Sequence, residues 1–222
     1  AVDSAGSVYV ADTNNRRVQN CVNGVCSIFA GVTGEWGNDF AHFSEPDDVA
    51  VDASGRVYVT DQHNGRVQVF DQSGAYLTTI GGSRGLLTGQ LQNPWGIGVD
   101  SSGNVYVADH GNQDVRKFAP GVAGWVQVNI NGFGDRANSS VYSLAPFAGN
   151  LYAGTGNWSG AGAQLWRTNS GTDWTPAATS GLGDPCNGGI DHLLEFKGQL
   201  YAGTYNWCWD VNGSDGGQIW RS

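Results

Sequence analysis

The chain has 222 residues and a net charge of −9 at pH 7, and it contains 35 glycines. An acidic surface repels phosphate backbones, so no nucleic-acid partner is expected. No stretch approaches the roughly 20 apolar residues of a membrane-spanning helix, so no membrane insertion is expected.

The first predicted elements belong to a repeat that begins at the first residue. Segment 1–12, AVDSAGSVYVAD, returns in similar form at 50–61 and 98–109, which are offsets of 49 and 48 residues. Asp and Gly favour tight turns, because Asp bonds the backbone and Gly tolerates positive φ. We therefore expect four short strands in each repeat. In the second copy they fall at 49–51, 57–59, 66–70 and 76–80.

Two cysteines lie inside the first repeat and two lie much later. Cys21 and Cys26 flank Asn23-Gly24, a pair typical of two-residue hairpin turns, which favours a disulfide across that hairpin. Cys186 and Cys208 are then expected to pair between two later repeats. The spacings lack the doubled C-x-x-C pattern of a zinc site.

A second type of repeat follows in the C-terminal half. NLYAGTGNW at 150–158 recurs as QLYAGTYNW at 199–207, again 49 residues apart. Both repeat types place a hydrophobic-Tyr-small pattern after a turn, so they can occupy equivalent places in one ring. A period in the forties with four strands per repeat is typical of a propeller. We expect an all-β fold, a single β-propeller domain over 1–222 with about five blades, mostly four-stranded.

The first ~130 residues resemble NHL repeats. The matching residues are PWGIGVD at 94–100 and the repeated Val-Tyr-Val segments, each of which leads to an Asp. Residues 131–222 resemble propeller repeats of the Kelch and Asp-box kind, on the segment 164–174 that ends Gly-Thr-Asp-Trp. The Asp-box match is partial, because Asn169 stands where that motif has Asp. Both resemblances imply a propeller.

The last predicted blade is incomplete. Residues 218–222 would form its third strand, and no fourth strand follows. Exposed strand edges pair readily with other chains. This predicts self-association, either as a homo-oligomer or through a neighbouring chain that completes the blade.

Repeated Asp and His residues are the first candidates for chemistry. Asp12, Asp61 and Asp109 end equivalent strands, and their repetition favours a structural role with pairing to the arginines at 17 and 66. His63 and His110 follow two of these Asp residues. NHL-type peptide-amidating lyases resemble this in using propeller-face His residues around a metal, which leaves a metal site at one mouth of the ring as an alternative.

Aromatic residues beside amides are candidates for ligand contact. A ring beside an amide suits stacking on a sugar while bonding its hydroxyls, and the alternative is that the Trp side chains fill gaps between blades. The closely spaced oxygens of a later loop could bind calcium as a cofactor, as could the acidic connector 35–48. The predicted ligand-binding residues are Asn157, Trp158, Asn206, Trp207 and Trp209, and the predicted metal-binding residues are Asp210, Asn212 and Asp215.

These features predict an extracellular, secreted scaffold rather than an enzyme. Asn138, Asn157 and Asn212 begin N-x-[ST] glycosylation sequons, which together with the cysteines favour secretion. No nucleophile motif of the Gly-x-Ser-x-Gly type appears. The predicted function is non-enzymatic binding of protein or glycan, or self-assembly. The alternative is a metal-dependent lyase or hydrolase of the NHL-like type, and fold alone does not decide between them.

Overall fold

The computed structural model describes residues 1–222 except 88, 120–125, 130 and 207–216. The chain divides into two compact units, Ala1–Tyr106 with Phe118–Val126, and Val107–Lys117 with Gln127–Ser222. Regular structure in the described residues is β-strand and short 3₁₀ helix. None of these helices is long and apolar enough to cross a membrane.

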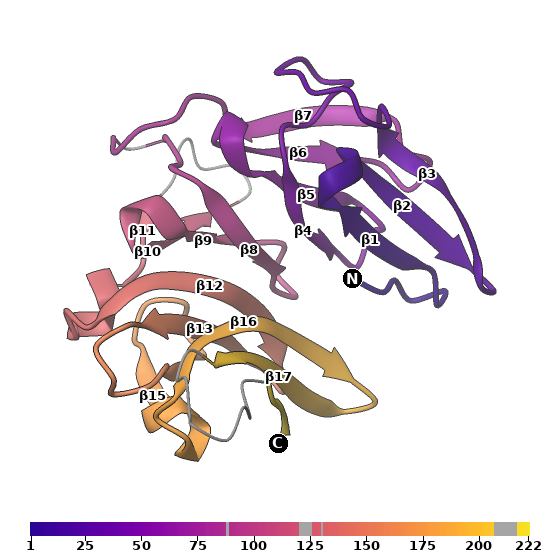
Figure 1. Ribbon diagram of the computed structural model, residues 1–222. Helices are drawn as coiled ribbons and strands as arrows, with labels where there is room; N and C mark the ends of the chain where they lie inside the picture. Colours follow the sequence, from indigo (N-terminus) through magenta and orange to yellow (C-terminus); the bar gives the residue numbers. More distant parts are fainter. Residues whose placement is uncertain (88, 120–125, 130, 207–216) are drawn as a thin grey trace. The chain divides into compact units, whose positions relative to one another are not determined.

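The first unit contains two sheets that pack against each other (Figure 1). The three-stranded sheet comprises β1 (Val8–Asp12), β2 (Arg17–Val22) and β3 (Val25–Gly31). The four-stranded sheet comprises β4 (Pro46–Val51), β5 (Val57–Asp61), β6 (Arg66–Phe70) and β7 (Tyr76–Gly81). Short helices η1 (Thr13–Asn15) and η2 (Gln62–Asn64) join equivalent strands in the two sheets. The four strands expected in the second repeat are confirmed.

The core of the first unit lies between these two sheets. Every residue of β5 and β6 is buried, as expected for strands covered on both faces. Aromatic side chains pack in the interface between the sheets. The ring centroids of Tyr9 and Phe29 lie 5.0 Å apart, and those of Phe43 and Phe70 lie 6.0 Å apart. The buried cluster consists of Tyr9, Val18, Ala30, Phe43, Val49, Val57, Val59 and Phe70.

A third sheet has the same order as the second. It comprises β8 (Pro94–Val99), β9 (Val105–Asp109), β10 (Asp114–Phe118) and β11 (Val126–Gln127), with η3 (His110–Asn112) between β9 and β10. Inside the first unit, two hydrogen bonds link β8 to the preceding sheet. The Thr60 hydroxyl donates to the Trp95 carbonyl at 2.8 Å, and the Ile97 N–H donates to the Asp48 carboxylate at 3.0 Å.

The second unit is built on two long, irregular hairpins. The first of the two C-terminal repeats comprises η4 (Asn131–Gly134), β12 (Asn138–Phe147), β13 (Asn150–Asn157), β14 (Leu165–Thr168) and β15 (Thr175–Ala178). The second comprises η5 (Ser180–Gly183), β16 (Asn187–Phe196), β17 (Gln199–Asn206) and β18 (Ile219–Arg221). Its core cluster consists of Ala145, Ala163, Leu165, Ile190, Leu200 and Ala202.

The repeated Asp residues have the structural role expected of them. Asp12 accepts a hydrogen bond from Arg17 Nε at 2.8 Å, and Asp61 accepts one from Arg66 Nε at 2.7 Å. In the third repeat an Asp replaces the arginine at 114. Arg116 lies 2.9 Å from this Asp and 3.8 Å from Asp109, so the ion pair is rebuilt from a position two residues later.

The hairpin disulfide is confirmed. Cys21 and Cys26 are register partners in β2 and β3, and their sulfur atoms are bonded across the Asn23-Gly24 turn. The second expected pair involves Cys208, which lies outside the described residues, so that pairing stays a prediction.

The last strand lies at the end of its sheet. In the described residues β18 pairs with β17 and has no strand on its other side. Completion of this blade by a second copy or a neighbouring chain stays a prediction, as do the count of five blades and the single domain.

Candidate functional site

Each long hairpin of the second unit has two register shifts, and the second shift in each hairpin shapes the candidate site. The register of β12 with β13 shifts between Val141 and Ser143, which leaves Tyr142 as the extra residue. The register of β16 with β17 shifts in the same way between Ile190 and His192, which leaves Asp191 as the extra residue. A bulge re-aims the side chain of the unpaired residue, and bulges are common beside functional sites. Tyr142 and Asp191 are 49 positions apart, so they occupy equivalent places in the two repeats.

Glycines let these two side chains lie over one patch of backbone. Gly156 and Gly189 are register partners that join the two hairpins. A Cβ at Gly156 would lie 2.5–2.7 Å from the Tyr142 ring and hydroxyl, and one at Gly189 would lie 2.8 Å from Asp191 Oδ1 and 3.0 Å from Tyr142 Cε2. Real Cβ atoms do not approach other atoms so closely. The absence of side chains at these two positions therefore brings Tyr142 and Asp191 together.

Further aromatic rings surround this pair. Trp158 directly follows β13, and Tyr205 is the register partner of Gly189 in β17. The Trp158 and Tyr205 rings lie 6.0 Å apart at 58°, and the two residues are 51% and 49% exposed. The His110 imidazole stacks on the Tyr142 ring at 5.5 Å and 18°. We call the set Tyr142, Asp191, Trp158, Tyr205 and His110 the bulge site.

Burial controls the electrostatics of the bulge site. It raises the pKa of Tyr142, while hydrogen bonds with Ser140 and Trp158 act in the opposite direction and Asp191 adds to the rise. Burial also raises the pKa of Asp191, and the charge of neighbouring His192 opposes the rise. Burial lowers the pKa of the His110 imidazole, which favours its neutral form.

The Asp191 carboxylate has no strong cationic partner. All 11 Lys and Arg residues of the chain lie in the described segments, and none of them forms an ion pair with Asp191. The fully buried acids behave differently. Asp61 and Asp114, for example, each lie within 3 Å of an arginine Nε.

The predicted ligand residues have diverse environments. Trp158 is exposed, as a ligand contact requires. Asn157 is fully buried, where its amide donates to Asn138 and accepts from Ser159, so its side chain is not presented to solvent. Asn206 ends β17 and is partly exposed. The remaining predicted ligand and metal residues, Trp207, Trp209, Asp210, Asn212 and Asp215, lie outside the described residues.

The burial of Asn138 and Asn157 bears on glycosylation. Both begin sequons, and they are 1% and 0% exposed. A glycan on either amide nitrogen would break the buried hydrogen bonds that these nitrogens donate. We expect both positions to be unmodified in folded protein from a glycosylating secretory host, as measured by peptide mass mapping. A folded, glycan-bearing Asn138 or Asn157 would contradict this placement.

The histidines do not assemble a metal centre within the described segments. No group of three His, Cys, Asp or Glu side chains there could hold a metal ion. His63 lies 3.4 Å from Glu45, and His42 lies 2.8 Å from Asp39. Calcium in the predicted loop of Asp210, Asn212 and Asp215 stays a prediction.

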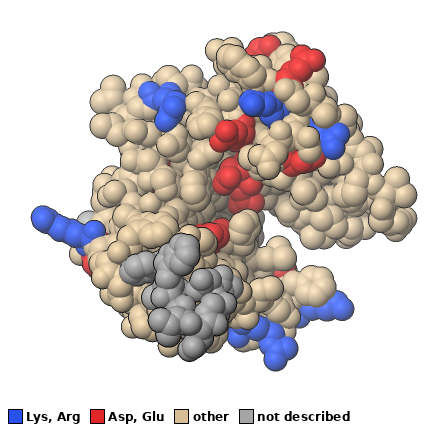
Figure 2. All heavy atoms as spheres, viewed as in Figure 1, with Lys and Arg blue, Asp and Glu red and all other residues tan. Residues whose placement is uncertain are grey.

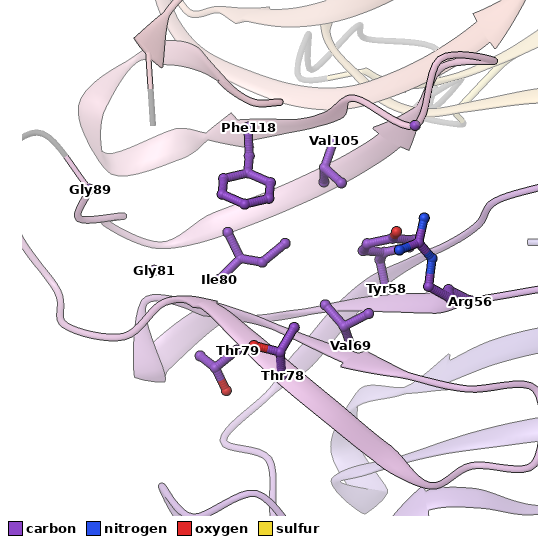
Figure 3. A pocket seen from close by; sticks show the side chains of 11 residues that line it. Arg56, Tyr58, Val69, Thr78, Thr79, Ile80, Gly81, Gly89, Val105 and Phe118 are labelled. Carbon is purple, nitrogen blue, oxygen red and sulfur yellow. The ribbon is translucent and has the colours of Figure 1, made fainter. Parts of the chain in front are cut away.

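A groove of about 390 Å³ in the first unit is a second candidate. Figure 3 shows Val105 and Phe118 facing Ile80 across the groove, with Tyr58 and Arg56 at one end. That polar end is already paired, because Arg56 Nε and the Tyr58 hydroxyl both donate to Asp52, at 2.7 and 3.0 Å. Its walls are mostly apolar, so the groove offers little to orient a polar ligand. The bulge site is chemically richer.

Tyr142, Asp191 and Tyr205 lie at the centre of the bulge site. From the sequence, Tyr205 was placed inside the repeated segment 199–207, but none of the three was singled out. Tyr142 and Asp191 share no motif, because one is aromatic and the other acidic. The only sign in the sequence that they belong together is that they occupy equivalent positions in the 49-residue repeat. A register shift, however, leaves no local mark in either strand.

Comparison with known proteins supports the fold. Similar solved structures include one of a nidogen–laminin complex, with a TM-score of 0.66 and 16% identity over 90% of this chain and 70% of that one. The structure of a gluconolactonase from Xanthomonas campestris has a TM-score of 0.65 and 15% identity, over 91% of this chain and 67% of that one. The structure of virginiamycin B lyase from Staphylococcus aureus has a TM-score of 0.58 and 10% identity, over 91% of this chain and 60% of that one.

These likenesses place the chain among all-β proteins with a β-propeller fold. The NHL repeat model matches residues 43–70 and 91–118, so those two segments are NHL repeats. The resemblance expected for the N-terminal half is thereby confirmed. Among curated proteins, no sequence matches this chain.

Proposed function

We propose that this chain is an extracellular, non-enzymatic propeller that binds glycan ligands through the bulge site. The observation that carries the proposal is the pair of half-exposed rings of Trp158 and Tyr205, 6.0 Å apart. Exposed rings stack on the apolar face of a sugar, and nearby polar groups bond its hydroxyls. Asp191 and the partly exposed Asn206 supply such groups. The disulfide between Cys21 and Cys26 suits the oxidising environment of a secreted protein.

The test is to measure glycan binding by the whole chain on a glycan array, followed by calorimetry with the best ligand. Replacing Trp158 or Tyr205 with alanine is expected to weaken binding about tenfold, because an aromatic contact of about 1.4 kcal/mol corresponds to one decade in affinity. The matched control is Trp36→Ala, which removes a 72% exposed ring from the other unit. Equal affinities for all four proteins would contradict the proposal.

The alternative function is a metal-dependent lyase or hydrolase. One observation favours it: the His110 imidazole, whose pKa is lowered by burial, stacks on Tyr142 beside Asp191. A neutral imidazole can accept a proton or bind a metal. Two of the similar solved structures are of a lyase and a gluconolactonase. Native mass spectrometry of the protein as isolated separates the two functions, since one stoichiometric divalent ion would favour the enzyme.

A further inference from the structure

The environment of Asp191 indicates what kind of ligand the bulge site takes. Burying a carboxylate costs free energy unless a cation or strong donors compensate it. Here burial raises the pKa of Asp191, and no Lys or Arg pairs with it. His192, which follows it in the chain, is exposed to solvent. A positively charged ligand group would supply the missing partner.

The surrounding rings suit a cation of a particular kind. Ammonium groups are attracted to the faces of Trp and Tyr rings, and the attraction is strongest where water is excluded. Tyr142 lies within contact of the same backbone patch as Asp191, and Tyr205 is paired to that patch through Gly189. Trp158 extends the aromatic surface to solvent. Rings with one carboxylate favour an organic ammonium over a bare metal ion, which needs several oxygen or nitrogen ligands.

The net negative charge of the chain also favours a cationic ligand. The chain has 20 acidic and 11 basic residues. On the face drawn in Figure 2, acidic and basic side chains both lie over the first unit, and basic side chains lie at the edge of the second unit. A net negative potential raises the local concentration of cations and speeds their association.

We propose that the bulge site binds an organic ammonium group, with Asp191 as its counter-ion and the exposed rings of Trp158 and Tyr205 as its aromatic walls. This rests on the proposed glycan function, and it names the ligand class as an amino sugar with a free ammonium group.

The first experiment is calorimetric titration of the whole chain with three sugars. Glucosamine carries the ammonium, N-acetylglucosamine carries a neutral amide at the same position, and glucose carries a hydroxyl. Glucosamine is expected to bind about tenfold tighter than the other two. Asp191→Asn is expected to remove this preference, so that the variant binds glucosamine no tighter than N-acetylglucosamine. Equal affinities in the parent protein, or a preference that survives Asp191→Asn, would overturn the proposal.

The matched control is Asp173→Asn, which removes the same charge from an exposed turn of the same unit. It is expected to keep the preference for glucosamine. Should Asp191→Asn fail to fold, as judged by circular dichroism, Trp158→Ala replaces it. In that variant glucosamine affinity should fall, and tetramethylammonium affinity should fall with it.

Titration with tetramethylammonium separates this proposal from the glycan function. Binding of tetramethylammonium that is lost in Asp191→Asn, without binding of any sugar, would support the ammonium site and contradict the glycan function. Binding of neutral sugars alone would support the glycan function and overturn the ammonium site. If neither glucosamine nor tetramethylammonium binds, the ammonium site is wrong.

Discussion

Replacing Asp61 with alanine is expected to destabilise the fold by about 3–5 kcal/mol, the usual cost of removing one partner from a buried ion pair. The Asp61 side chain is 0% exposed. It accepts hydrogen bonds from Arg66 Nε at 2.7 Å, from the Ser44 N–H at 2.7 Å and from Asn64 at 2.8 Å. Alanine would leave the Arg66 guanidinium buried without a counter-charge.

The same arginine also holds the connector between the first two sheets. Its terminal nitrogens donate to the carbonyls of Asn38, Asp39 and His42, at 2.6, 2.6 and 3.0 Å. Loss of Asp61 would free the guanidinium to move and would loosen these bonds. We therefore expect the connector to open together with the ion pair, and to become more accessible to protease.

The first repeat supplies a matched control. Asp12 occupies the equivalent position and bonds Arg17 at 2.8 Å, but its side chain is 19% exposed. Asp12→Ala is expected to cost no more than about 1 kcal/mol, because solvent replaces the lost partner. Urea unfolding of both variants measures the difference through the transition midpoint and slope. Equal losses at the two positions would show that burial does not set the cost.

Replacing Asn138 with alanine is expected to cost about 3 kcal/mol, since each buried polar group left without a partner costs about 1–3 kcal/mol. The Asn138 amide donates to the Gly132 carbonyl at 3.0 Å and to Gln164 Oε1 at 2.7 Å. Its oxygen accepts from the Thr155 hydroxyl at 3.2 Å. These bonds join η4, β12 and β13.

The control is Asn150→Ala at the start of β13, whose amide makes an exposed bond to the Ala148 carbonyl. Its expected cost is within about 0.5 kcal/mol. Thermal unfolding of both variants checks the prediction. A loss at Asn138 no larger than that at Asn150 would contradict a structural role for the buried amide.

The next repeat contains the same arrangement around a second asparagine. Asn187 donates to the Gly181 carbonyl and to Gln218, both at 2.9 Å, and accepts from the Thr204 hydroxyl at 3.1 Å. This equivalence was visible in the sequence only as a 49-residue offset between two asparagines. Nothing in the local pattern distinguished these buried residues from partly exposed ones such as Asn150.

Local sequence patterns were enough to locate the repeat and the strands and turns of its second copy. Short apolar runs bounded by Asp and Gly form strands and turns through hydrogen bonds between nearby residues, so β4 to β7 could be located from local pattern. The pairing of Asp12 with Arg17 and the disulfide of Cys21 with Cys26 were predictable for the same reason. In each case the partners face each other across one hairpin.

The burial of the repeated residues, and the contacts among them, depend on how distant segments pack. Asp61 is covered because the connector folds over it, whereas the equivalent Asp12 is partly exposed. Tyr142 and Asp191 meet because two register shifts and two glycines place them over the same backbone. Burial and register depend on packing between segments far apart in the chain, and a local pattern does not encode such contacts.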